Sequence, residues 1–349
     1  MQVHQIDPLK DERWTKFVDS HPSGSVFHTA GWLTALTRTY GYKASAYVTT
    51  DSDRTLTGAL VVCAVKSWLT GSRLVSLPFS DHCQPMVNSD DHLCAILAAL
   101  GNAVDHQKQR YVELRPLDTD QSRLAAQTFL RKSQAFTYHS LDLRPKAEEL
   151  FAKFHKNGIQ KMIERAKRER LEYEQGRSQE LLANFYRLLL VTRRKHGLPA
   201  QPLAWFHNLI DAFGENLSIH LASKNGIPVA SILTLRHGNT LVYKYGCSDS
   251  AFNNLGGTPF LLWNAIQQAK ESGAEHCDLG RSDLENEGLI TFKNRWGATR
   301  YDLSYYRYPM QPAQPAEARW KGRFLRRVVE QLPTSVVTVA GNLLYKHIA

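Results

Sequence analysis

The sequence is poor in cysteine, and its cysteines form no recognisable pattern. There are five among 349 residues, an odd number, widely separated and without a Cys-x-x-Cys pair. Structural zinc sites and the disulfide frameworks of small secreted domains both require closely spaced cysteines or histidines. We therefore expect no metal site, reduced and buried thiols, and a cytoplasmic protein.

Long apolar runs are also lacking. A membrane-spanning helix needs about 20 consecutive apolar residues, and the first 22 residues contain no long run of this kind. We expect neither a signal peptide nor a membrane span. The length of 349 residues exceeds what one hydrophobic core usually holds. Two domains of about 150 residues each are the expected organisation.

The positive charge of the chain is concentrated in two segments. The formal net charge is +10. Residues 151–170 hold seven Lys/Arg against two Glu, a net +5, and residues 311–349 hold six against two, a net +4. Such segments suit an anionic partner, such as a phosphate, a nucleic acid or a lipid head group. Solvated helix faces explain them equally well.

The two halves of the chain follow the same order of predicted elements. In each half, two strands precede a helix and a third strand, and the second strand ends in Ser-Asp, at Ser80-Asp81 and Ser248-Asp249. This internal repeat predicts an α/β fold of the α+β type, with two tandem domains, each a mixed sheet with flanking helices. The predicted strands are residues 56–66, 73–79, 110–115, 227–236, 240–246 and 275–281, and the two helices are residues 90–106 and 259–271.

Proline and composition divide the chain into three parts. Pro145 follows a predicted strand and prevents its continuation. We therefore expect an N-terminal domain of residues 1–145 and a C-terminal domain of residues 146–310. The remaining residues, 311–349, begin with a Pro-containing linker and form a basic, helical tail.

Two basic helical segments flank the C-terminal domain. Residues 146–170 form an arm in which Asn157 and Gln160 have the spacing of a capping box, which predicts a helix restart at Asn157. In the tail, residues 319–329 are amphipathic and basic. Such a helix either lies on an anionic membrane surface or packs on the domains.

A glycine-rich turn, residues 253–259, separates a predicted strand from an amphipathic helix. It contains Gly256 and Gly257, and Pro259 suits the first turn of the helix. Backbone N–H groups at such a helix start attract an anionic group, for example a pyrophosphate. Two glycines alone would be weak evidence for an anion site. The position of this turn, between a predicted strand and an amphipathic helix that a second strand follows, is the stronger evidence.

The second half, with this turn, resembles the GNAT acyltransferase fold. In that family a splayed strand pair receives the pantetheine arm of coenzyme A, and the turn before the next helix receives the pyrophosphate. The resemblance implies that residues 243–248 form the splaying strand, with acyl-CoA as the co-substrate and no tightly bound cofactor. It implies contacts to the co-substrate from Tyr245, Gly256, Gly257 and Thr258.

Residues 1–309 as a whole resemble the Fem-type transferases, which carry two GNAT-like domains in tandem. The likeness lies in Phe27-His-Thr-Ala-Gly-Trp, in Ile159-Gln-Lys-Met-Ile-Glu-Arg-Ala-Lys, and in Asp278-Leu-Gly-Arg followed by Phe292-Lys293. Fem proteins transfer amino acids from aminoacyl-tRNA to the peptide of a cell-wall precursor. Their relatives, the Fem-like acetyltransferases, are associated with exopolysaccharide and envelope assembly in Gram-negative bacteria.

The resemblance implies a catalytic role for Lys293, because a family lysine at that place supports the charge that develops during acyl transfer. A fixed cation beside the tetrahedral oxyanion lowers the barrier. The attacking amine also needs a base, and Asp278, Asp249 and Asp283, at predicted strand ends, are candidates. The alternatives are a surface lysine and ordinary ion pairs of these aspartates.

Five further residues are predicted to contact the substrate. Arg115 and Arg281 end equivalent strands of the two halves and can hold phosphates or carboxylates bidentately, or form buried ion pairs. Asp81 and His82 form a polar lip at a strand end that can touch the acceptor. Because they are adjacent, they cannot form a catalytic triad with Ser80. The fifth residue is Phe292, the neighbour of Lys293.

We therefore expect an acyltransferase that moves an acyl group from acyl-CoA to an amine or hydroxyl of a cell-envelope polysaccharide or its precursor. The alternative is a tRNA-dependent aminoacyl transferase acting on a peptidoglycan precursor, with the basic arm holding nucleic acid. A third, non-enzymatic interpretation is a scaffold at the inner face of the membrane, bound peripherally through residues 319–329.

Overall fold

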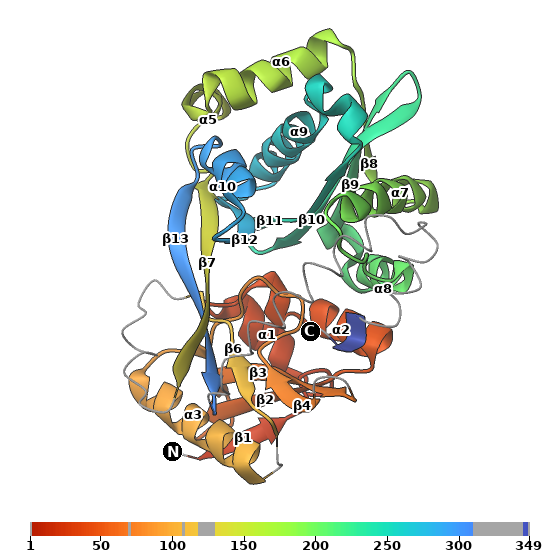
Figure 1. The fold of residues 1–349 in the computed structure, drawn as a ribbon. Helices are drawn as coiled ribbons and strands as arrows, with labels where there is room; N and C mark the ends of the chain where they lie inside the picture. The colour runs from red at the N-terminus through yellow and green to blue at the C-terminus, as the bar shows by residue number, and fades with distance from the viewer. Residues whose placement is uncertain (1, 69–70, 107–108, 118–129, 310–344, 348–349) are drawn as a thin grey trace. The chain divides into compact units, whose positions relative to one another are not determined.

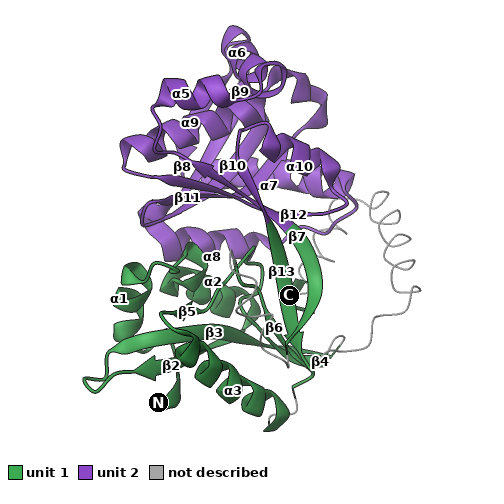
Figure 2. Cartoon of the chain, turned by 90° about the vertical axis from the view of Figure 1, so that its left-hand side faces the viewer, with its two compact units in different colours: residues 1–136, 302–313, 344–349 green, residues 137–301, 314–343 purple. Residues whose placement is uncertain are grey.

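The computed structural model describes residues 2–68, 71–106, 109–117, 130–309 and 345–347 (Figure 1). The predicted tail helix, residues 319–329, lies outside these residues. The chain divides into two compact units (Figure 2). Unit 1 contains residues 1–136, 302–313 and 344–349, and unit 2 contains residues 137–301 and 314–343.

Unit 1 is a mixed sheet with helices on both faces. Its strand order is β1-β2-β3-β4-β6-β13, and β5 pairs with β3. Strand β4 pairs with β6 in parallel, whereas β1–β2, β2–β3, β3–β4 and β6–β13 are antiparallel. The elements are β1 (Val3–Ile6), α1 (Arg13–Ser20), α2 (Ala30–Tyr40), β2 (Lys43–Thr50), β3 (Leu56–Ser67), β4 (Gly71–Val75), β5 (Met86–Val87), α3 (Asp90–His106) and β6 (Val112–Leu114).

Alternation along the strands builds the core of unit 1. Tyr47, Leu60 and Leu74 point to one face and pack against the apolar side of α3, which contributes Ile96 and Leu100. Successive strand residues point to opposite faces of a sheet. The intervening residues of β2 and β3 therefore face the helices α1 and α2 on the other side.

Unit 2 is also a mixed sheet between two helical layers. Its strand order is β13-β7-β12-β11-β10-β9-β8. Strand β11 pairs with β12 in parallel, whereas β10–β11, β9–β10 and β8–β9 are antiparallel. The elements are β7 (Arg131–Asp142), α5 (Ala147–Lys153), a π-helical turn η2 (Lys156–Gln160), α6 (Lys161–Arg168), β8 (Glu172–Gly176), α7 (Gln179–Lys195), α8 (Leu203–Phe213), β9 (Leu217–Lys224), β10 (Ile227–His237), β11 (Thr240–Ser248), the 3-10 helix η4 (Ser250–Leu255), α9 (Gly257–Glu271), β12 (His276–Asp283), α10 (Glu287–Asn294) and β13 (Thr299–Tyr308).

The two faces of the unit 2 sheet carry different helices (Figure 1). On one face, α5, α6 and α9 enclose a core that includes Ile163, Leu261 and Leu279. On the other face lie α7 and α8, which contribute the buried residues Phe185 and Phe206. Burying an apolar stripe of each helix against the sheet is the main stabilisation of such a layered domain.

The predicted fold class is confirmed. The order of two strands, a helix and a third strand occurs twice, as β3–β4–α3–β6 and as β10–β11–α9–β12. In both, the third strand pairs in parallel with the second. The chain passes from unit 1 to unit 2 between residues 136 and 137, within β7, and both β7 and β13 contribute residues to the two units. The expected domain boundary at residue 145 stays a prediction.

The predicted helix restart at Asn157 is wrong in its details. The helical turn η2 begins at Lys156, and the ring of His155 accepts the hydrogen bond from the N–H of Gly158 at 3.0 Å. The side-chain amide of Gln160 instead donates to the carbonyl oxygen of Phe154, at 2.7 Å. His155, two positions before Asn157, therefore takes the capping role, which the Asn-x-x-Gln spacing did not reveal.

Candidate active site

Strands β11 and β12 part within unit 2. They pair only where Thr240–Val242 lies against His276–Asp278. In the pairing of β11 with β10, Tyr243 and Tyr245 face consecutive residues, so Lys244 is an extra residue, a β-bulge. A bulge bends its strand and increases its twist. The bulge thus turns β11 away from β12 directly after the last paired residues, and it opens a wedge between two strands of the sheet.

The bulge also reverses the direction of the side chains that follow it. Tyr243 packs against the core beneath α9, whereas Tyr245, beyond the bulge, lies on the opposite face. There its hydroxyl accepts a hydrogen bond from Nε1 of Trp205 at 2.9 Å, and its ring packs against Phe206. Tyr245 was predicted to bind the co-substrate. The structure places it on the α7–α8 face, away from the glycine turn at the start of α9.

The double-glycine turn is closely packed. Gly256 has φ +78°, and a Cβ atom there would overlap the carbonyl oxygen of Met162 in α6. At Gly257 a Cβ atom would lie 2.8 Å from Cβ of Ala230. Both positions require glycine for close contact with α6 and β10, as well as for the start of α9. Thr258, the next residue, is half-buried.

Lys293 is a buried cation held by the backbone of β12. Its side chain is on α10 and is 2% exposed. The Nζ atom donates to the carbonyl oxygens of Gly280, at 2.9 Å, and Arg281, at 2.8 Å. Gly280 has φ +72°, a left-handed conformation that glycine adopts at little cost. The ammonium group is therefore fixed beside the part of β12 that follows the wedge.

The predicted bases have structural partners. Asp278 is buried, and its Oδ1 accepts a hydrogen bond from the N–H of Gly280 at 2.6 Å. Asp249 caps η4 by accepting the N–H of Ala251 at 3.0 Å. Asp283, at the end of β12, is exposed. Of the three, Asp278 is the one at the wedge, because it is the last residue of β12 paired with β11.

A histidine that the sequence analysis missed lies close to Lys293. His139 of β7 is fully buried, and its Nε2 lies 3.0 Å from Oδ1 of Asn294, the residue after Lys293. Burial lowers the pKa of His139 below its ordinary value, and the charges of Lys293 and Arg300 lower it further, although the bond to Asn294 opposes this. The 155 positions between His139 and Asn294 left no local signal of the contact.

Phe292 precedes Lys293 in the sequence, and Arg281 of β12 contacts it in the fold. Phe292 is half-buried, and its ring meets the edge of Trp296 at a centroid distance of 6.2 Å. Arg281 is half-buried and contributes its carbonyl oxygen to Lys293. Unit 2 thus brings together Lys293, Arg281 and Phe292 with Asp278, while Tyr245 lies on the other face of its sheet.

Comparison with known families fits this geometry. The profile described as "Acetyltransferase (GNAT) domain" matches residues 153–301. These residues form a GNAT domain, and the chain is an acyltransferase. A comparison with the sequences of curated proteins found no match.

Solved structures with the same fold extend over both units. The chain is similar to FemX, with 16% identity and a TM-score of 0.71 over 95% of this chain and 100% of that one. It is similar to L-PGS from Bacillus licheniformis, with 15% identity and a TM-score of 0.57 over 93% and 98%. A tandem GNAT protein from the clavulanic acid biosynthesis pathway gives 12% identity and a TM-score of 0.56 over 90% and 100%. The fold is therefore that of Fem-like tandem GNAT proteins.

In unit 1, Arg115 is part of a buried ion-pair network. Its guanidinium group lies 2.9 Å from Oε1 of Glu113 and donates to the carbonyl oxygen of Leu77 at 2.9 Å. Its charge also lies over the ring of Tyr305, at 5.1 Å. Burial alone would lower the pKa of Arg115, but Glu113 and Tyr305 raise it above its ordinary value. Of the two predicted alternatives, this arrangement is the buried ion pair.

Asp81 and His82 lie in the loop that Arg115 supports. The carbonyl oxygen of Asp81 accepts a hydrogen bond from the hydroxyl of Tyr305 at 2.7 Å. His82 is buried, with its ring edge-on to Phe27 at 5.1 Å. The carboxylate of Asp81 belongs to a half-buried residue, so it is the more accessible of the two. Their contact with an acceptor stays a prediction.

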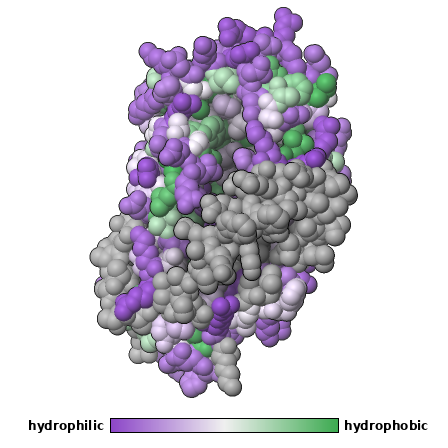
Figure 3. Space-filling view, in the orientation of Figure 1, coloured by the Kyte–Doolittle hydropathy of each residue, from purple (hydrophilic) through white to green (hydrophobic). Residues whose placement is uncertain are grey.

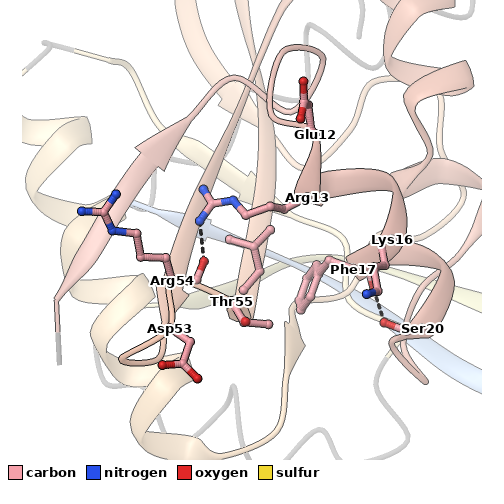
Figure 4. Close-up of a pocket in the computed structure, with 9 residues that line it drawn as sticks. Glu12, Arg13, Lys16, Phe17, Ser20, Asp53, Arg54 and Thr55 are labelled. Carbon is pink, nitrogen blue, oxygen red and sulfur yellow. Dashed lines mark hydrogen bonds between the residues drawn. The ribbon is translucent and has the colours of Figure 1, made fainter.

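A separate cavity in unit 1 contains none of the predicted residues. It has a volume of about 420 Å³ and lies between α1 and the turn that joins β2 to β3 (Figure 4). Arg13 crosses it and donates to the carbonyl oxygen of Arg54 at 2.6 Å, while Asp11 holds the same guanidinium at 2.6 Å. Phe17 and Leu56 supply apolar lining. The guanidinium of Arg13 is thus already bonded to groups of this chain.

Two further features concern the described part of the chain. No helix within it is both long and apolar enough to cross a membrane. No group of three or more His, Cys, Asp or Glu side chains within it could hold a metal ion.

Proposed function

We propose that this protein transfers an acyl group to an amine or hydroxyl of a cell-envelope polysaccharide or its precursor. The observation that carries the proposal is the buried Lys293 ammonium, fixed on two carbonyl oxygens of β12 within a GNAT domain. Acyl transfer passes through a tetrahedral oxyanion, and a fixed cation beside that oxygen stabilises it. In this proposal Lys293 supplies the cation, and Phe292 and Arg281 line the acceptor side.

The proposed donor is acyl-CoA. The wedge between β11 and β12 gives a place for an extended arm beside a strand edge. At the start of α9, the N–H groups of Gly257 and Thr258 precede the first intrahelical bonds, which is where helices attract phosphate. Titration calorimetry with acetyl-CoA tests this directly, and the absence of measurable heat would count against this donor.

An aminoacyl-tRNA donor is the second candidate, and two observations favour it. Gly256 is packed against the carbonyl oxygen of Met162, so α6 covers part of the turn that would hold phosphates. The outer surface of η2 and α6 is hydrophilic (Figure 3), and Lys156, Lys161, Lys167 and Arg168 are exposed there. Binding of tRNA through this surface would weaken steeply with added salt.

Mass spectrometry of the envelope glycans and their precursors identifies both the acceptor and the transferred group. The mass of the transferred group then decides between acyl-CoA and aminoacyl-tRNA as the donor. Glycans from cells with the gene are compared with those from cells lacking it. A missing acetyl or other acyl mass supports the first proposal, and a missing aminoacyl mass on a precursor peptide supports the second. Identical glycans and precursors in both strains would contradict an acyl transfer in the envelope.

Membrane association is a separate question, because residues 319–329 lie outside the described part of the chain. We propose that this segment gives peripheral contact with anionic lipid. Flotation with vesicles containing anionic lipid, using the full chain and a chain that ends at residue 310, tests it. Equal flotation of the two proteins would contradict a role for the tail.

A further inference from the structure

Three buried polar groups without a hydrogen-bond partner lie on two neighbouring strands of unit 2. Within the described part of the chain, Nδ1 of His139, Oγ1 of Thr137 and Oγ of Ser282 are buried and have no hydrogen-bond partner. Thr137 and His139 share one face of β7, since they are two positions apart, and Ser282 is on β12, which adjoins β7. Nearly all buried polar atoms in proteins are paired, and an unpaired one costs about 1–3 kcal/mol. Three such atoms on adjoining strands suit a place where a ligand supplies the missing partners.

The contacts of His139 define which of its nitrogens is available. Its Nε2 lies 3.0 Å from Oδ1 of Asn294. A carbonyl oxygen can only accept, so Nε2 carries the proton and Nδ1 of the neutral ring keeps its lone pair. Burial disfavours the charged ring, as do the nearby charges of Lys293 and Arg300. His139 is thus a fixed, neutral imidazole with an unpaired acceptor nitrogen.

Its position relative to Lys293 gives this nitrogen a chemical use. Asn294, which holds His139, directly follows Lys293 on α10, and the electrostatic influence of Lys293 reaches the ring. Two of the carboxylates predicted as bases accept hydrogen bonds from backbone N–H groups, Asp278 from that of Gly280 and Asp249 from that of Ala251, and the third, Asp283, is exposed. The imidazole of His139 combines proximity to Lys293 with a buried nitrogen lone pair that no described group of the chain occupies.

We propose that His139 is the general base of the reaction, with Nδ1 accepting the hydrogen of the attacking amine or hydroxyl. This inference rests on the proposed acyl transfer. As the nucleophile's nitrogen or oxygen bonds to the acyl carbon, its proton passes to Nδ1 and the carbonyl electrons move to the oxygen beside Lys293. The tetrahedral intermediate then collapses, the bond to the leaving sulfur or oxygen breaks, and that atom receives the proton from the imidazolium. The products are the acylated acceptor and the free thiol or hydroxyl.

His139→Gln separates this role from a structural one. The amide nitrogen of glutamine can take the place of Nε2 and still donate to Asn294. Glutamine has no basic nitrogen at the place of Nδ1. The matched control is His220→Gln, because His220 is also a buried histidine of unit 2, bonded at both ring nitrogens to Tyr173 and Thr234, at 2.8 and 3.0 Å. If His139 only supports the fold, the two variants should behave alike in catalysis.

The assay uses the full chain, radiolabelled acetyl-CoA or a charged tRNA pool as donor, and envelope extract from cells lacking the gene as acceptor. At saturating donor and extract we expect His139→Gln to lower the turnover by about 100-fold or more, with little change in the donor concentration for half-saturation. The turnover of His220→Gln should stay within about threefold of the wild-type value, which is a small change compared with the loss of a general base. Turnover of His139→Gln within the same threefold would overturn the proposal.

Failure of this inference and failure of the proposed function give different results. If the wild type transfers no label from either donor, the acyl transfer itself is wrong. If the wild type is active and Lys293→Met is not, while His139→Gln is, only the role of His139 is wrong. Should His139→Gln fail to fold, imidazole nitrogen NMR of the wild type decides. A proton on Nε2 and none on Nδ1 is expected, and a proton on Nδ1 overturns the proposal.

Discussion

In unit 1, Arg307 binds Glu113 through two nitrogens, Nε at 2.8 Å and Nη2 at 2.6 Å from the same carboxylate oxygen. The other oxygen of Glu113 lies 2.9 Å from Arg115. Burial alone would raise the pKa of Glu113, but the two guanidinium groups hold it below its ordinary value. One carboxylate, only 4% exposed, therefore balances two arginines that are 194 and two positions away in the sequence.

Replacing Glu113 by glutamine should destabilise unit 1 strongly. The substitution leaves two cations without their counter-charge, and breaking a buried ion pair in this way typically costs about 3–5 kcal/mol. The midpoint of urea unfolding measures the loss. The exposed pair of Asp142 and Arg144 provides the control, since Asp142→Asn should leave the midpoint nearly unchanged. Equal midpoints for both variants would contradict a buried network at Glu113.

Acid should weaken unit 2 through His220. Burial lowers the pKa of His220 to about 4, from 6.5 for a free histidine. The unfolded chain therefore binds a proton below about pH 6.5, whereas the folded chain does so only near pH 4. Stability is lost as the pH falls between these values, by about 3 kcal/mol at the lower end. His139 adds a change of the same sign, because burial lowers its pKa as well.

Urea unfolding at pH 7 and pH 4.5 tests this prediction. The wild type should be markedly less stable at pH 4.5, and His220→Gln, which has no titrating ring, should show a smaller difference between the two values. An unchanged difference would mean that other groups cause the acid sensitivity.

Gly256→Ala should destabilise the contact between α6 and α9. The left-handed backbone at Gly256 costs a non-glycine residue about 1–2 kcal/mol, and a Cβ atom there also overlaps the carbonyl oxygen of Met162. Gly273 isolates the second effect, because it has φ +85° but no atom within 4 Å of a Cβ. Thermal unfolding should therefore show a larger loss for Gly256→Ala than for Gly273→Ala. Equal losses of thermal stability in the two variants would show that the contact with Met162 of α6 adds no cost at Gly256.

Helices with local start and stop signals could be predicted closely from the sequence. Helix α7 (Gln179–Lys195) carries such signals, because Ser178 caps its first turn at Leu181 and Gly197 follows its end. Here the capping side chain and the glycine lie within a few positions of the helix. The predicted strand at residues 73–79 was too long, because β4 ends at Val75 and Leu77 has φ +50°. Contacts of the distant Arg115 hold that turn, and a single sequence does not reveal them.

The candidate site was predicted only in part for the same reason. The Phe292-Lys293 pair was recognisable as a short motif, and unit 2 does bury Lys293 against the backbone of β12. The contact of Tyr245 with the co-substrate was implied by the family resemblance, and the bulge at Lys244, which sets the face on which Tyr245 lies, has no mark in the sequence. His139 could not be found, because its partner Asn294 is on an element that only the folded sheet brings beside β7.

The most direct test of the proposed mechanism compares Lys293→Met with Lys270→Met. Lys270 also donates to two backbone carbonyl oxygens of unit 2, those of Leu143 and Pro145, so both variants lose a lysine bonded in the same way. In the transfer assay with labelled donor and envelope extract, Lys293→Met should lose activity by about 100-fold or more, and Lys270→Met should keep it. Full activity of a folded Lys293→Met protein would contradict the account.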